Sequence, residues 1–265
     1  MIHTLSPALL KFGSFEIRWY GLMYVLGFIV GQYILKHLAK KRFFPVSKES
    51  VETLVTYLLI GLFLGARLVY VFVYNWDLYK EAPWEVFMVW QGGLSFHGGL
   101  LGFIVAALIF AKKQKISFWQ VADSLTVAAT PGIFFGRIGN FINGELFGRQ
   151  TELPWGIIFE NTGGGPFPRH PSQLYEAFGE GAFLFLLLWF LHKKVKNHGI
   201  LTAIFVMGYA VIRFAIEFAR EPDAQLGFLW GGVTMGQILC TLMAILGGIF
   251  WILSQKQGIR VERGL

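Results

Sequence analysis

A stretch of fourteen residues in the middle of the chain concentrates side chains that can hold an anion. It covers residues 136–149, GRIGNFINGELFGR, and contains two arginines, two asparagines, one glutamate and four glycines. Arginine gives bidentate contacts to phosphate, asparagine gives directional hydrogen bonds, and glycine lets a ligand approach the backbone. The stretch directly follows an apolar run that ends at Phe135. The sequence therefore indicates an anion site at the edge of a hydrophobic segment, and we expect a phospholipid head group as its ligand.

The composition places that segment in a membrane. Of the 265 residues, 55% are hydrophobic and only 15% are charged, with a mean hydropathy of +0.55. Soluble domains carry about 25% charged residues. Residues 19–35, 86–111 and 224–255 contain no Asp, Glu, Lys or Arg, and a helical span needs about 20 mostly apolar residues. The sequence predicts an all-α integral membrane protein.

The apolar runs and the connectors between them predict a topology. We expect about seven transmembrane helices, at approximately 19–35, 51–74, 93–111, 118–135, 172–191, 199–218 and 231–253. The connectors after the first, third and fifth spans, with the tail, hold 14 Lys and Arg, against 7 on the opposite side. The positive-inside rule then places the N-terminus outside and the C-terminus in the cytoplasm. Six or eight spans would result if a marginal span, such as the fifth, were re-entrant.

This topology gives a single transmembrane domain over residues 1–265. A small segment on the outer side of the membrane, residues 137–171, would carry this anion-binding stretch and a turn-rich head. The formal net charge of +7 is explained by the basic connectors, and no basic stripe is interleaved with aromatics, so nucleic acid is not an expected partner. No metal site is expected, because His170 has no second His or Cys at ligand spacing. The only cysteine, Cys240, is expected to be a small buried hydrophobe.

Ionisable residues inside predicted spans need a partner or a function. Arg213 and Glu217 are four residues apart, which puts them on one helix face within ion-pair reach, and Arg220 follows three residues later. This pair is either a structural lock between helices or part of a site. Arg67, in the second span, could pair with a carboxylate such as Asp123, Glu176 or Glu180, or could take part in function.

Two more residues at the predicted outer ends of spans have two possible roles each. His97 is either a satisfied buried donor or a general base near neutral pH. Tyr20 follows Trp19, which we expect to be an interfacial aromatic anchor, and its hydroxyl could contact a lipid head group. Ser172, after Pro171, is by default a helix-start residue.

Several blocks of this sequence resemble the prolipoprotein diacylglyceryl transferase family. The most specific is residues 136–145 with Gly148, which matches the signature of that family. The other blocks lie along most of the chain, at residues 19–21, 61–70, 95–99, 169–176 and 213–223. The resemblance implies that a diacylglyceryl group moves from phosphatidylglycerol to the lipobox cysteine thiol of a bacterial prolipoprotein. The implied by-product is glycerol phosphate, the implied location is the bacterial inner membrane with the site toward the periplasm, and no cofactor is expected.

This resemblance suggests roles for individual residues. Arg137 and Arg213 would bind the phosphate and stabilise its developing charge, and Glu145 and Glu217 would orient these arginines. The remaining substrate contacts would come from Tyr20, Asn140, Asn143, Arg220 and the backbone of Gly148. His97 would accept the thiol proton, directly or through a phosphate oxygen; the identity of the base is the least constrained of these assignments.

Two other classes of protein share some of these features. A secondary transporter for an anionic solute would also bury Arg and Glu, but it would be expected to show two related halves, and the sequence shows no internal repeat. A non-catalytic lipid-binding scaffold would share the head-group site without forming a thioether.

Overall fold

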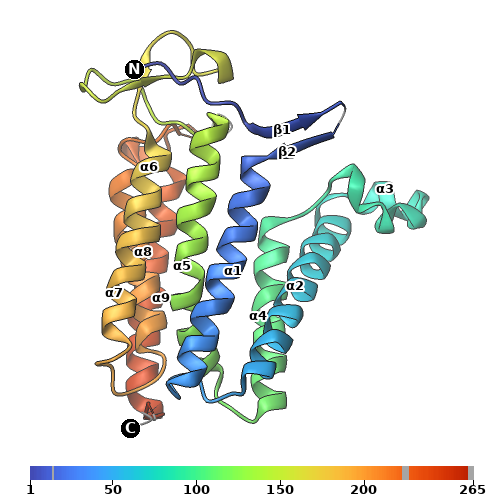
Figure 1. Cartoon of the computed structure of the whole chain (residues 1–265), viewed down its shortest axis with the longest axis vertical. Helices are drawn as coiled ribbons and strands as arrows, with labels where there is room; N and C mark the ends of the chain where they lie inside the picture. The colour runs from blue at the N-terminus through green and yellow to red at the C-terminus, as the bar shows by residue number, and fades with distance from the viewer. Residues whose placement is uncertain (14, 223–226, 262–265) are drawn as a thin grey trace. The chain divides into compact units, whose positions relative to one another are not determined.

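The computed structural model of the chain describes residues 1–13, 15–222 and 227–261, and these residues are mostly helical (Figure 1). They form two compact units. The first unit contains Met1–Leu35 and Asp123–Val261, and the second contains Lys36–Ala122. Two long helices, α1 (Trp19–Lys40) and α5 (Phe118–Asn143), begin in one unit and end in the other.

Among the described residues, five helical segments are long and apolar enough to cross a membrane. They are α1, α2 with the π-helix η1 (Lys48–Val69 and Tyr70–Tyr74), α4 (Phe96–Gln114), α6–η5–α7 (Ser172–Glu176, Ala177–Phe183 and Leu184–Leu191), and α9 (Met235–Gln257). The helix α8 (Ile200–Ile216) is apolar but shorter, and α5 is long but more polar. The structure therefore supports a multi-pass membrane protein, and the count of seven spans stays a prediction.

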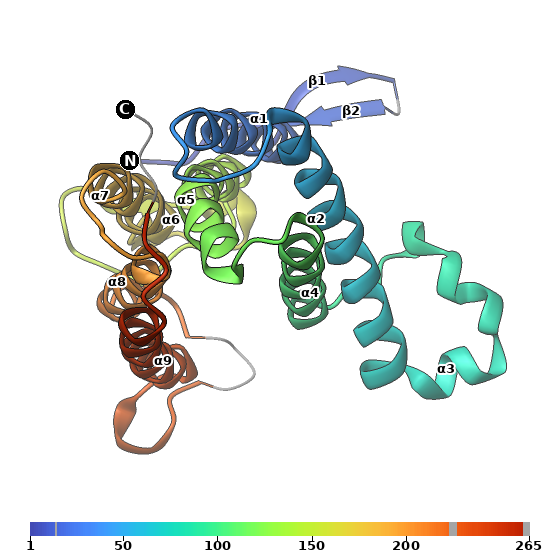
Figure 2. The ribbon, with the colours of Figure 1, turned by 90° about the horizontal axis from the view of Figure 1, so that it is seen from below.

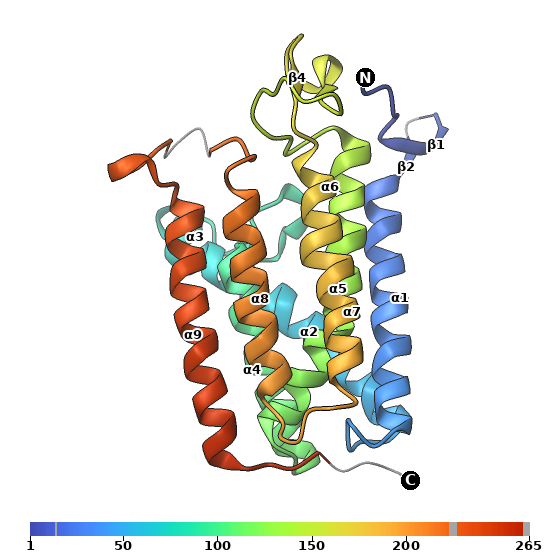
Figure 3. The same ribbon diagram turned by 90° about the vertical axis from the view of Figure 1, so that its left-hand side faces the viewer.

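The polar character of α5 follows from its place in the first unit. Three of its polar side chains are fully buried, those of Asp123, Ser124 and Thr130. A Cβ on Gly27 of α1 would lie 3.1 Å from Gly132 Cα on α5, so these two helices approach closely. Figure 3 shows α5 between α1 and the helix formed by α6, η5 and α7. Because protein surrounds α5 on both sides, it can carry polar groups that a lipid-facing helix could not.

The second unit is built on the packing of α2 against α4, which lie side by side in Figure 2. Gly61 and Gly65 of α2 face Gly98 and Gly102 of α4. A Cβ on Gly102 would lie 1.9 Å from Gly61 O, and one on Gly65 would lie 2.3 Å from Gly98 O. Small residues four apart on both helices thus allow backbone contact, which is a common way for helices to associate in membranes.

The segment that follows α2 in this unit is short and mostly helical. It consists of α3 (Trp76–Glu81) and the 3₁₀ turns η2 (Pro83–Phe87) and η3 (Val89–Gln91). Many of its large apolar side chains are exposed, among them Trp76, Trp84, Phe87 and Trp90. Aromatic residues of this kind are common where a protein meets the membrane–water interface.

The first unit also contains two small antiparallel sheets, which the all-α prediction did not include. One pairs β1 (Ala8–Phe12) with β2 (Phe15–Arg18), directly before α1. The other pairs β3 (Ile157–Ile158) with β4 (Pro168–Arg169) and encloses the 3₁₀ turn η4 (Glu160–Thr162). A further 3₁₀ turn, η6 (Trp230–Gly232), precedes α9.

The chain's first residues are tied to the second of these sheets. His3 N donates to Ile158 O at 2.9 Å, and Ile158 N donates to Met1 O at 2.9 Å. The Nε2 of His3 donates to Phe141 O at 2.8 Å, and that carbonyl lies in the last turn of α5. The N-terminal segment is therefore fastened to the end of α5, at a carbonyl that also accepts from Gly144 N at 2.9 Å.

The helix that contains the fourth predicted span extends beyond that span. The span was expected at approximately residues 118–135, and α5 continues to Asn143. The glycines at 136 and 139 did not stop the helix. Gly139 instead packs against α1, where its Cβ would lie 3.0 Å from the ring of Tyr20. The first half of the signature stretch therefore has helical periodicity, and only residues 144–149 form a loop.

Candidate functional site: an arginine cluster

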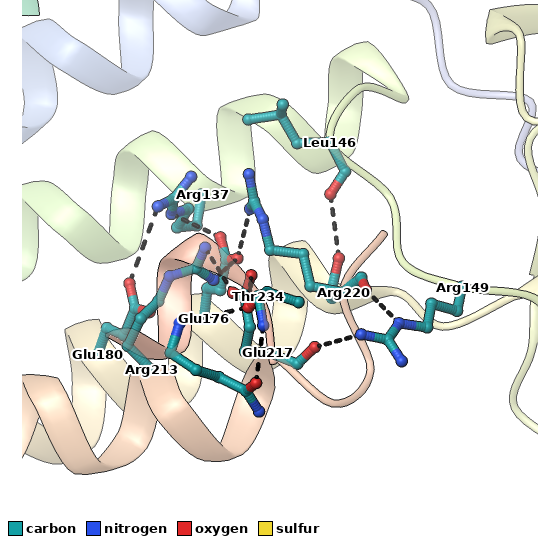
Figure 4. A network of polar contacts seen from close by, with 11 residues as sticks. Arg137, Leu146, Arg149, Glu176, Glu180, Arg213, Glu217, Arg220 and Thr234 are labelled. Carbon is teal, nitrogen blue, oxygen red and sulfur yellow. Dashed lines mark hydrogen bonds and ion pairs between the residues drawn. The ribbon is translucent and has the colours of Figure 1, made fainter. Parts of the chain in front are cut away.

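Three arginines converge on the carboxylate of Glu176, the last residue of α6 (Figure 4). Arg137 on α5 contacts Oε2 through Nε at 2.8 Å. Arg213 on α8 donates Nη1 to Oε1 at 2.9 Å, and Arg220 donates Nη1 to the same oxygen at 2.8 Å. These arginines have 23%, 15% and 16% of their side chains exposed, whereas Glu176 has 0%. The carboxylate is therefore the buried centre, and the guanidinium groups form its accessible side.

We call Arg137, Arg213 and Arg220, with Glu176, Glu180 and Glu217, the arginine cluster. All six belong to the first unit. Removing one partner from a buried charge pair typically costs about 3–5 kcal/mol, because the other charge is left buried and uncompensated. Three guanidinium groups could not be held this close together without carboxylates between them, so the cluster must be considered as one electrostatic unit.

The helix that carries Glu176 is wedged tightly between the helices that carry the arginines. A Cβ on Gly179 would lie 2.6 Å from Ile212 Cγ2 on α8, and one on Gly181 would lie 2.6 Å from the backbone of Phe134 on α5. Both glycines lie in η5, the π-helical segment that follows Glu176. Larger residues at these two positions would push the helices apart and lengthen the contacts of Glu176. Segments of π-helix occur frequently at functional sites.

The predicted pair of Arg213 and Glu217 is present, with 2.9 Å between Nη2 and Oε2. Glu217 also accepts a hydrogen bond at 3.0 Å from the Oγ1 of Thr234, the N-cap residue of α9. A Cβ on Gly236 would lie 2.6 Å from Glu217 Oε1, so only glycine lets the carboxylate come this close. Glu217 thus sits at the positive end of the α9 dipole. The pair orients Arg213 and also ties α8 to α9.

Glu180 is the more weakly paired carboxylate of the cluster. It has 0% of its side chain exposed, and its Oε2 lies 3.9 Å from Nη2 of Arg137. That separation is at the outer limit for an ion pair, whereas Glu176 has three contacts at 2.8–2.9 Å. Of the two carboxylates on this helix, Glu176 therefore holds the arginines and Glu180 adds a second, more distant negative charge beside Arg137.

The arrangement is suited to binding a phosphate group. Each guanidinium carries five N–H donors in a planar fork, and the carboxylate contacts above use one or two nitrogens of each. Arginine is the side chain best matched to the oxygens of a phosphate. Because the carboxylates hold the guanidinium groups in place beforehand, an anion would meet donors that are already oriented.

A second polar group lies at the end of α5. Asn140 is buried and donates Nδ2 to Glu145 Oε1 at 2.8 Å, and Asn143 donates to the same oxygen at 3.3 Å. Glu145 was expected to orient an arginine. The structure corrects this, because the hydrogen bonds of its side chain come from the two asparagines. Tyr20 packs against the same helix at Gly139 and shares a 3.0 Å hydrogen bond with the hydroxyl of Tyr24.

Gly148 marks the point where the signature loop crosses the end of α8. Its N–H donates to His170 O at 2.9 Å, and its carbonyl accepts from Arg169 Nη1 at 3.2 Å. A Cβ at this position would lie 2.2 Å from Ala219 O. Both backbone groups of Gly148 are thus bonded to protein, and the predicted contact between its backbone and a lipid head group stays a prediction.

Arg149, the second arginine of the signature stretch, binds protein carbonyls. Its Nε donates to Arg220 O at 2.7 Å and its Nη2 donates to Glu217 O at 3.1 Å, as Figure 4 shows. The guanidinium also lies 4.9 Å from the ring centre of Phe228. Arg149 therefore fastens the C-terminal turn of α8, where a cation is favourable to the helix dipole, and fixes the backbone that carries Glu217 and Arg220.

His170 and Ser172 connect this loop to α6. Burial lowers the pKa of His170, and the nearby positive charge of Arg149 lowers it further, so the imidazole is neutral near pH 7. Ser172 was expected to cap the helix. Its hydroxyl instead donates to Leu146 O at 3.0 Å, and no side chain caps α6. The start of α6 thus fixes the signature loop.

His97 belongs to the second unit, where it is the second residue of α4. Its side chain is exposed, so the interpretation as a buried, satisfied donor was wrong. The imidazole contacts the ring of Phe96, with 5.7 Å between the ring centres. An exposed imidazole can exchange protons, and its role as a base stays a prediction.

Arg67, also in the second unit, is held by backbone carbonyls. Its three nitrogens donate to Val86 O at 2.8 Å, Gly92 O at 2.8 Å, Gly93 O at 3.0 Å and Glu85 O at 2.6 Å. Pairing with a carboxylate was one of the two roles considered for Arg67, and the structure shows backbone carbonyls in its place. Arg67 is 6% exposed, and four of its five N–H groups are used, so it anchors the segment between α3 and α4 to α2.

The residues that position the predicted arginines and glutamates of the site were not predicted from the sequence. Glu176 and Glu180 were considered only as partners of Arg67, and Arg149 and Thr234 were given no positioning role. A signal for the first two was present, since two carboxylates four residues apart in an apolar helix require positive partners. Within the described residues, no three His, Cys, Asp or Glu side chains are grouped as metal ligands would be; the absence of a metal stays an expectation.

Comparison with known proteins assigns the chain to a family. A sequence model described as "Prolipoprotein diacylglyceryl transferase" matches residues 7–253. Among curated proteins, one from Geobacter sulfurreducens is 46% identical over 255 residues, which cover 96% of this chain and 97% of that protein. One from Vibrio campbellii is 45% identical over 261 residues, covering 98% and 94%.

A third relative, from Nitratidesulfovibrio vulgaris strain DP4, is 44% identical over 250 residues, covering 94% of each chain. All three carry the name "Phosphatidylglycerol--prolipoprotein diacylglyceryl transferase". Similarity at this level, extending over nearly the whole length of both partners, agrees with the resemblance seen in the signature stretch. The chain belongs to the prolipoprotein diacylglyceryl transferase family.

Proposed function

We propose that this chain transfers the diacylglyceryl group of phosphatidylglycerol to the lipobox cysteine of bacterial prolipoproteins. Curated relatives at 44–46% identity carry the corresponding enzyme name. The observation that supports the proposal within the structure is the arginine cluster, in which three partly exposed guanidinium groups are held on one buried carboxylate. Phosphatidylglycerol is an anionic lipid, and such a cluster in a membrane protein suits its phosphate.

The proposed reaction is a substitution at the glycerol carbon of the diacylglyceryl group. The cysteine sulfur of the prolipoprotein attacks this carbon, and the bond from the carbon to the phosphate oxygen breaks with its electron pair on the oxygen. The product is a thioether, and glycerol phosphate leaves. The phosphate changes from a diester with one negative charge to a monoester that develops a second. Arg137 and Arg213 stabilise this added charge, which is greater in the transition state than in the bound lipid.

The other residues have supporting roles in this proposal. Glu176 and Glu217 orient the arginines, and Arg220 contributes a third guanidinium. Tyr20, Asn140, Asn143 and Gly148 contribute to the head-group site. The nucleophile is supplied by the substrate, so the buried Cys240 of α9 is not needed for chemistry.

His97 takes the thiol proton in this proposal, directly or through a phosphate oxygen. A free thiol has a pKa of about 8.5 and needs only modest help to ionise near neutral pH, whereas arginine keeps its proton and cannot serve as a base. The test is His97→Gln, assayed for lipid transfer across a range of pH. An unchanged rate with an unchanged pH profile would remove His97 from this role.

We also propose the topology that this reaction requires. The protein would be a single transmembrane domain of about seven spans in the bacterial inner membrane, with its N-terminus and the arginine cluster toward the periplasm. The 14 Lys and Arg in the connectors assigned to the cytoplasm, against 7 on the other side, support this orientation. Cysteines placed in the β1–β2 turn and after α9 should react with impermeant thiol reagents from opposite sides of the membrane.

The deciding experiment uses purified protein in detergent, labelled phosphatidylglycerol and a peptide that contains a lipobox. We expect a diacylglyceryl thioether on the peptide, no product when the peptide's cysteine is replaced by serine, and loss of transfer in Arg137→Gln and Arg213→Gln. Binding of the lipid without product would support a scaffold, and movement of an anionic solute across vesicles would support a transporter. Transfer that survives neutralisation of both arginines would overturn the proposed mechanism.

A further inference from the structure

The carboxylate of Asp123 holds the beginning of α8, far along the helices from the arginine cluster. Asp123 lies in the first turns of α5 and is fully buried. Its Oδ2 accepts from Gly199 N at 2.8 Å, and its Oδ1 accepts from Thr202 N at 2.8 Å and from Thr202 Oγ1 at 2.7 Å. The Nδ1 of His198 lies 3.7 Å from Oδ2.

These contacts form a helix cap that comes from another helix. The residue at the N-cap position of α8 is Gly199, with a φ of +93° and no capping side chain of its own. Asp123 supplies the missing acceptor and a negative charge at the positive end of the α8 dipole. The cap therefore joins α5 at Asp123 to the first turn of α8 at Gly199 and Thr202.

From this joint, the two helices run in the same direction toward the arginine cluster (Figure 1). Arg137 lies about four turns beyond Asp123 on α5, and Arg213 lies about four turns beyond Gly199 on α8, which corresponds to roughly 21 Å along each helix. α8 runs without interruption from Gly199 to Arg213, and α5 continues through Pro131 as one helix, so a joint at one end sets the relative height of side chains at the other. The two distances match, and the arginines meet on Glu176.

We propose that Asp123 is a positioning residue, which fixes the axial register of α5 against α8 and thereby the spacing of Arg137 and Arg213 for the lipid phosphate. This inference rests on the proposed function. A purely apolar contact between these helices would keep them together but would tolerate small axial shifts. Hydrogen bonds from two backbone amides and one hydroxyl to a single carboxylate are directional, and they hold in only one register.

The test is a double-mutant cycle between Asp123 and Arg213. Asp123→Asn replaces one acceptor by an amide group that cannot accept from Gly199 N. We expect kcat/KM to fall about tenfold, as for the loss of one charge-assisted hydrogen bond. In an Arg213→Lys background, the bidentate phosphate contact is already lost, so the same change should lower kcat/KM by less than about threefold. Equal losses in both backgrounds would overturn the proposal, because they would mean that Asp123 acts only on general stability.

The cycle is also run on the equilibrium binding of phosphatidylglycerol to the purified protein, measured by calorimetry. Absence of thioether formation by the unmodified protein would refute the proposed function, whereas loss of coupling in the binding cycle would refute the role of Asp123. Thr202→Val removes only the hydrogen bond from the Thr202 hydroxyl to Asp123, and it replaces Asp123→Asn in the cycle if that variant does not fold. We expect kcat/KM to fall about threefold in the otherwise unmodified protein and by less in the Arg213→Lys background.

Thr130→Val is the matched control for both variants. Thr130 is a fully buried residue of the same helix, and its hydroxyl bonds to Val127 O within α5. Because this bond does not reach another helix, its loss should change kcat/KM by less than about twofold in either background. A control that showed the same coupling to Arg213 as Asp123 does would also count against a specific role for the joint.

Discussion

Arg67 and Arg213 are both arginines set in apolar helices, and the protein holds them in opposite ways. Arg67, in the second unit, donates to four backbone carbonyls and is 6% exposed. Arg213, in the first unit, contacts the carboxylates of Glu176 and Glu217 and keeps 15% of its side chain exposed. One arginine is enclosed by neutral dipoles, and the other is paired with charges and open on one side.

The difference separates a structural arginine from one that can bind a ligand. The carbonyls around Arg67 occupy four of its five N–H groups, and the groups it binds belong to the segment between α3 and α4. Little donor capacity is left for a substrate. In the arginine cluster, the carboxylates fix the guanidinium groups from the buried side and leave donors on the other. Counting the remaining donors is thus more informative than noting an arginine in a span.

The largest expected effect comes from removing the charge at the centre of the arginine cluster. Glu176→Gln should lower the free energy of unfolding in detergent by about 3–5 kcal/mol, because three arginines lose their common counter-charge. Glu180→Gln is the matched variant, on the same helix and equally buried, and should cost about 1 kcal/mol or less, since the ion-pair contact of Glu180 with Arg137 is at 3.9 Å. Similar losses for both would show that Glu176 is not the centre of the cluster.

Replacing each arginine by lysine tests the comparison directly. Lysine keeps the charge but loses the planar fork. Arg213→Lys should lower kcat/KM for lipid transfer roughly 100-fold, as for the loss of one oriented donor at a site of developing charge. Arg67→Lys should leave kcat/KM within about threefold and lower the unfolding temperature instead, because one ammonium cannot reach carbonyls on both sides of its loop.

The readouts for these two variants are transfer kinetics on the folded fraction and thermal unfolding of the same preparations. The division of roles would be wrong if Arg67→Lys impaired transfer as severely as Arg213→Lys without a loss of stability. It would also be wrong if Arg213→Lys proved to be only destabilised.

The smallest expected effect concerns pH and the loop that adjoins α6. The pKa of His170 is lowered by burial and then by Arg149, so the unfolded chain binds a proton at a higher pH than the folded protein does. Stability should therefore fall as the pH drops below the ordinary histidine value of about 6.5, and the effect should vanish above it.

His170→Gln should reduce this acid sensitivity. The measurement is the unfolding temperature at pH 7.5 and pH 5.5, and we expect the difference between the two to shrink in the variant. Glu160→Gln, at an exposed position of the head, is the control for a general charge effect. An undiminished difference in His170→Gln would mean that the histidine does not contribute to the pH dependence.

Residues related by helical periodicity could be predicted from the sequence, and residues related by packing could not. The pair of Arg213 and Glu217 follows from their spacing of four residues. The convergence of the arginines on Glu176 could not be predicted in this way, because Glu176 is 37 residues from Arg213 and 44 from Arg220. Arg149 shows the same limit. Its side chain is of a type that suits an anion, but it donates to backbone carbonyls at the end of α8, which helix packing brings beside it.

The sequence by itself determined that the chain is a membrane protein and which family it resembles, and it predicted which side chains bind a phosphate. These conclusions depend on composition, on local spacing and on a specific motif, all of which are properties of neighbouring residues. Only the tertiary structure decided which arginines share a carboxylate, which one is bound by carbonyls, and where Asp123 joins two helices. Ion pairs and hydrogen bonds act over a few ångströms, so their partners are fixed by how the helices pack.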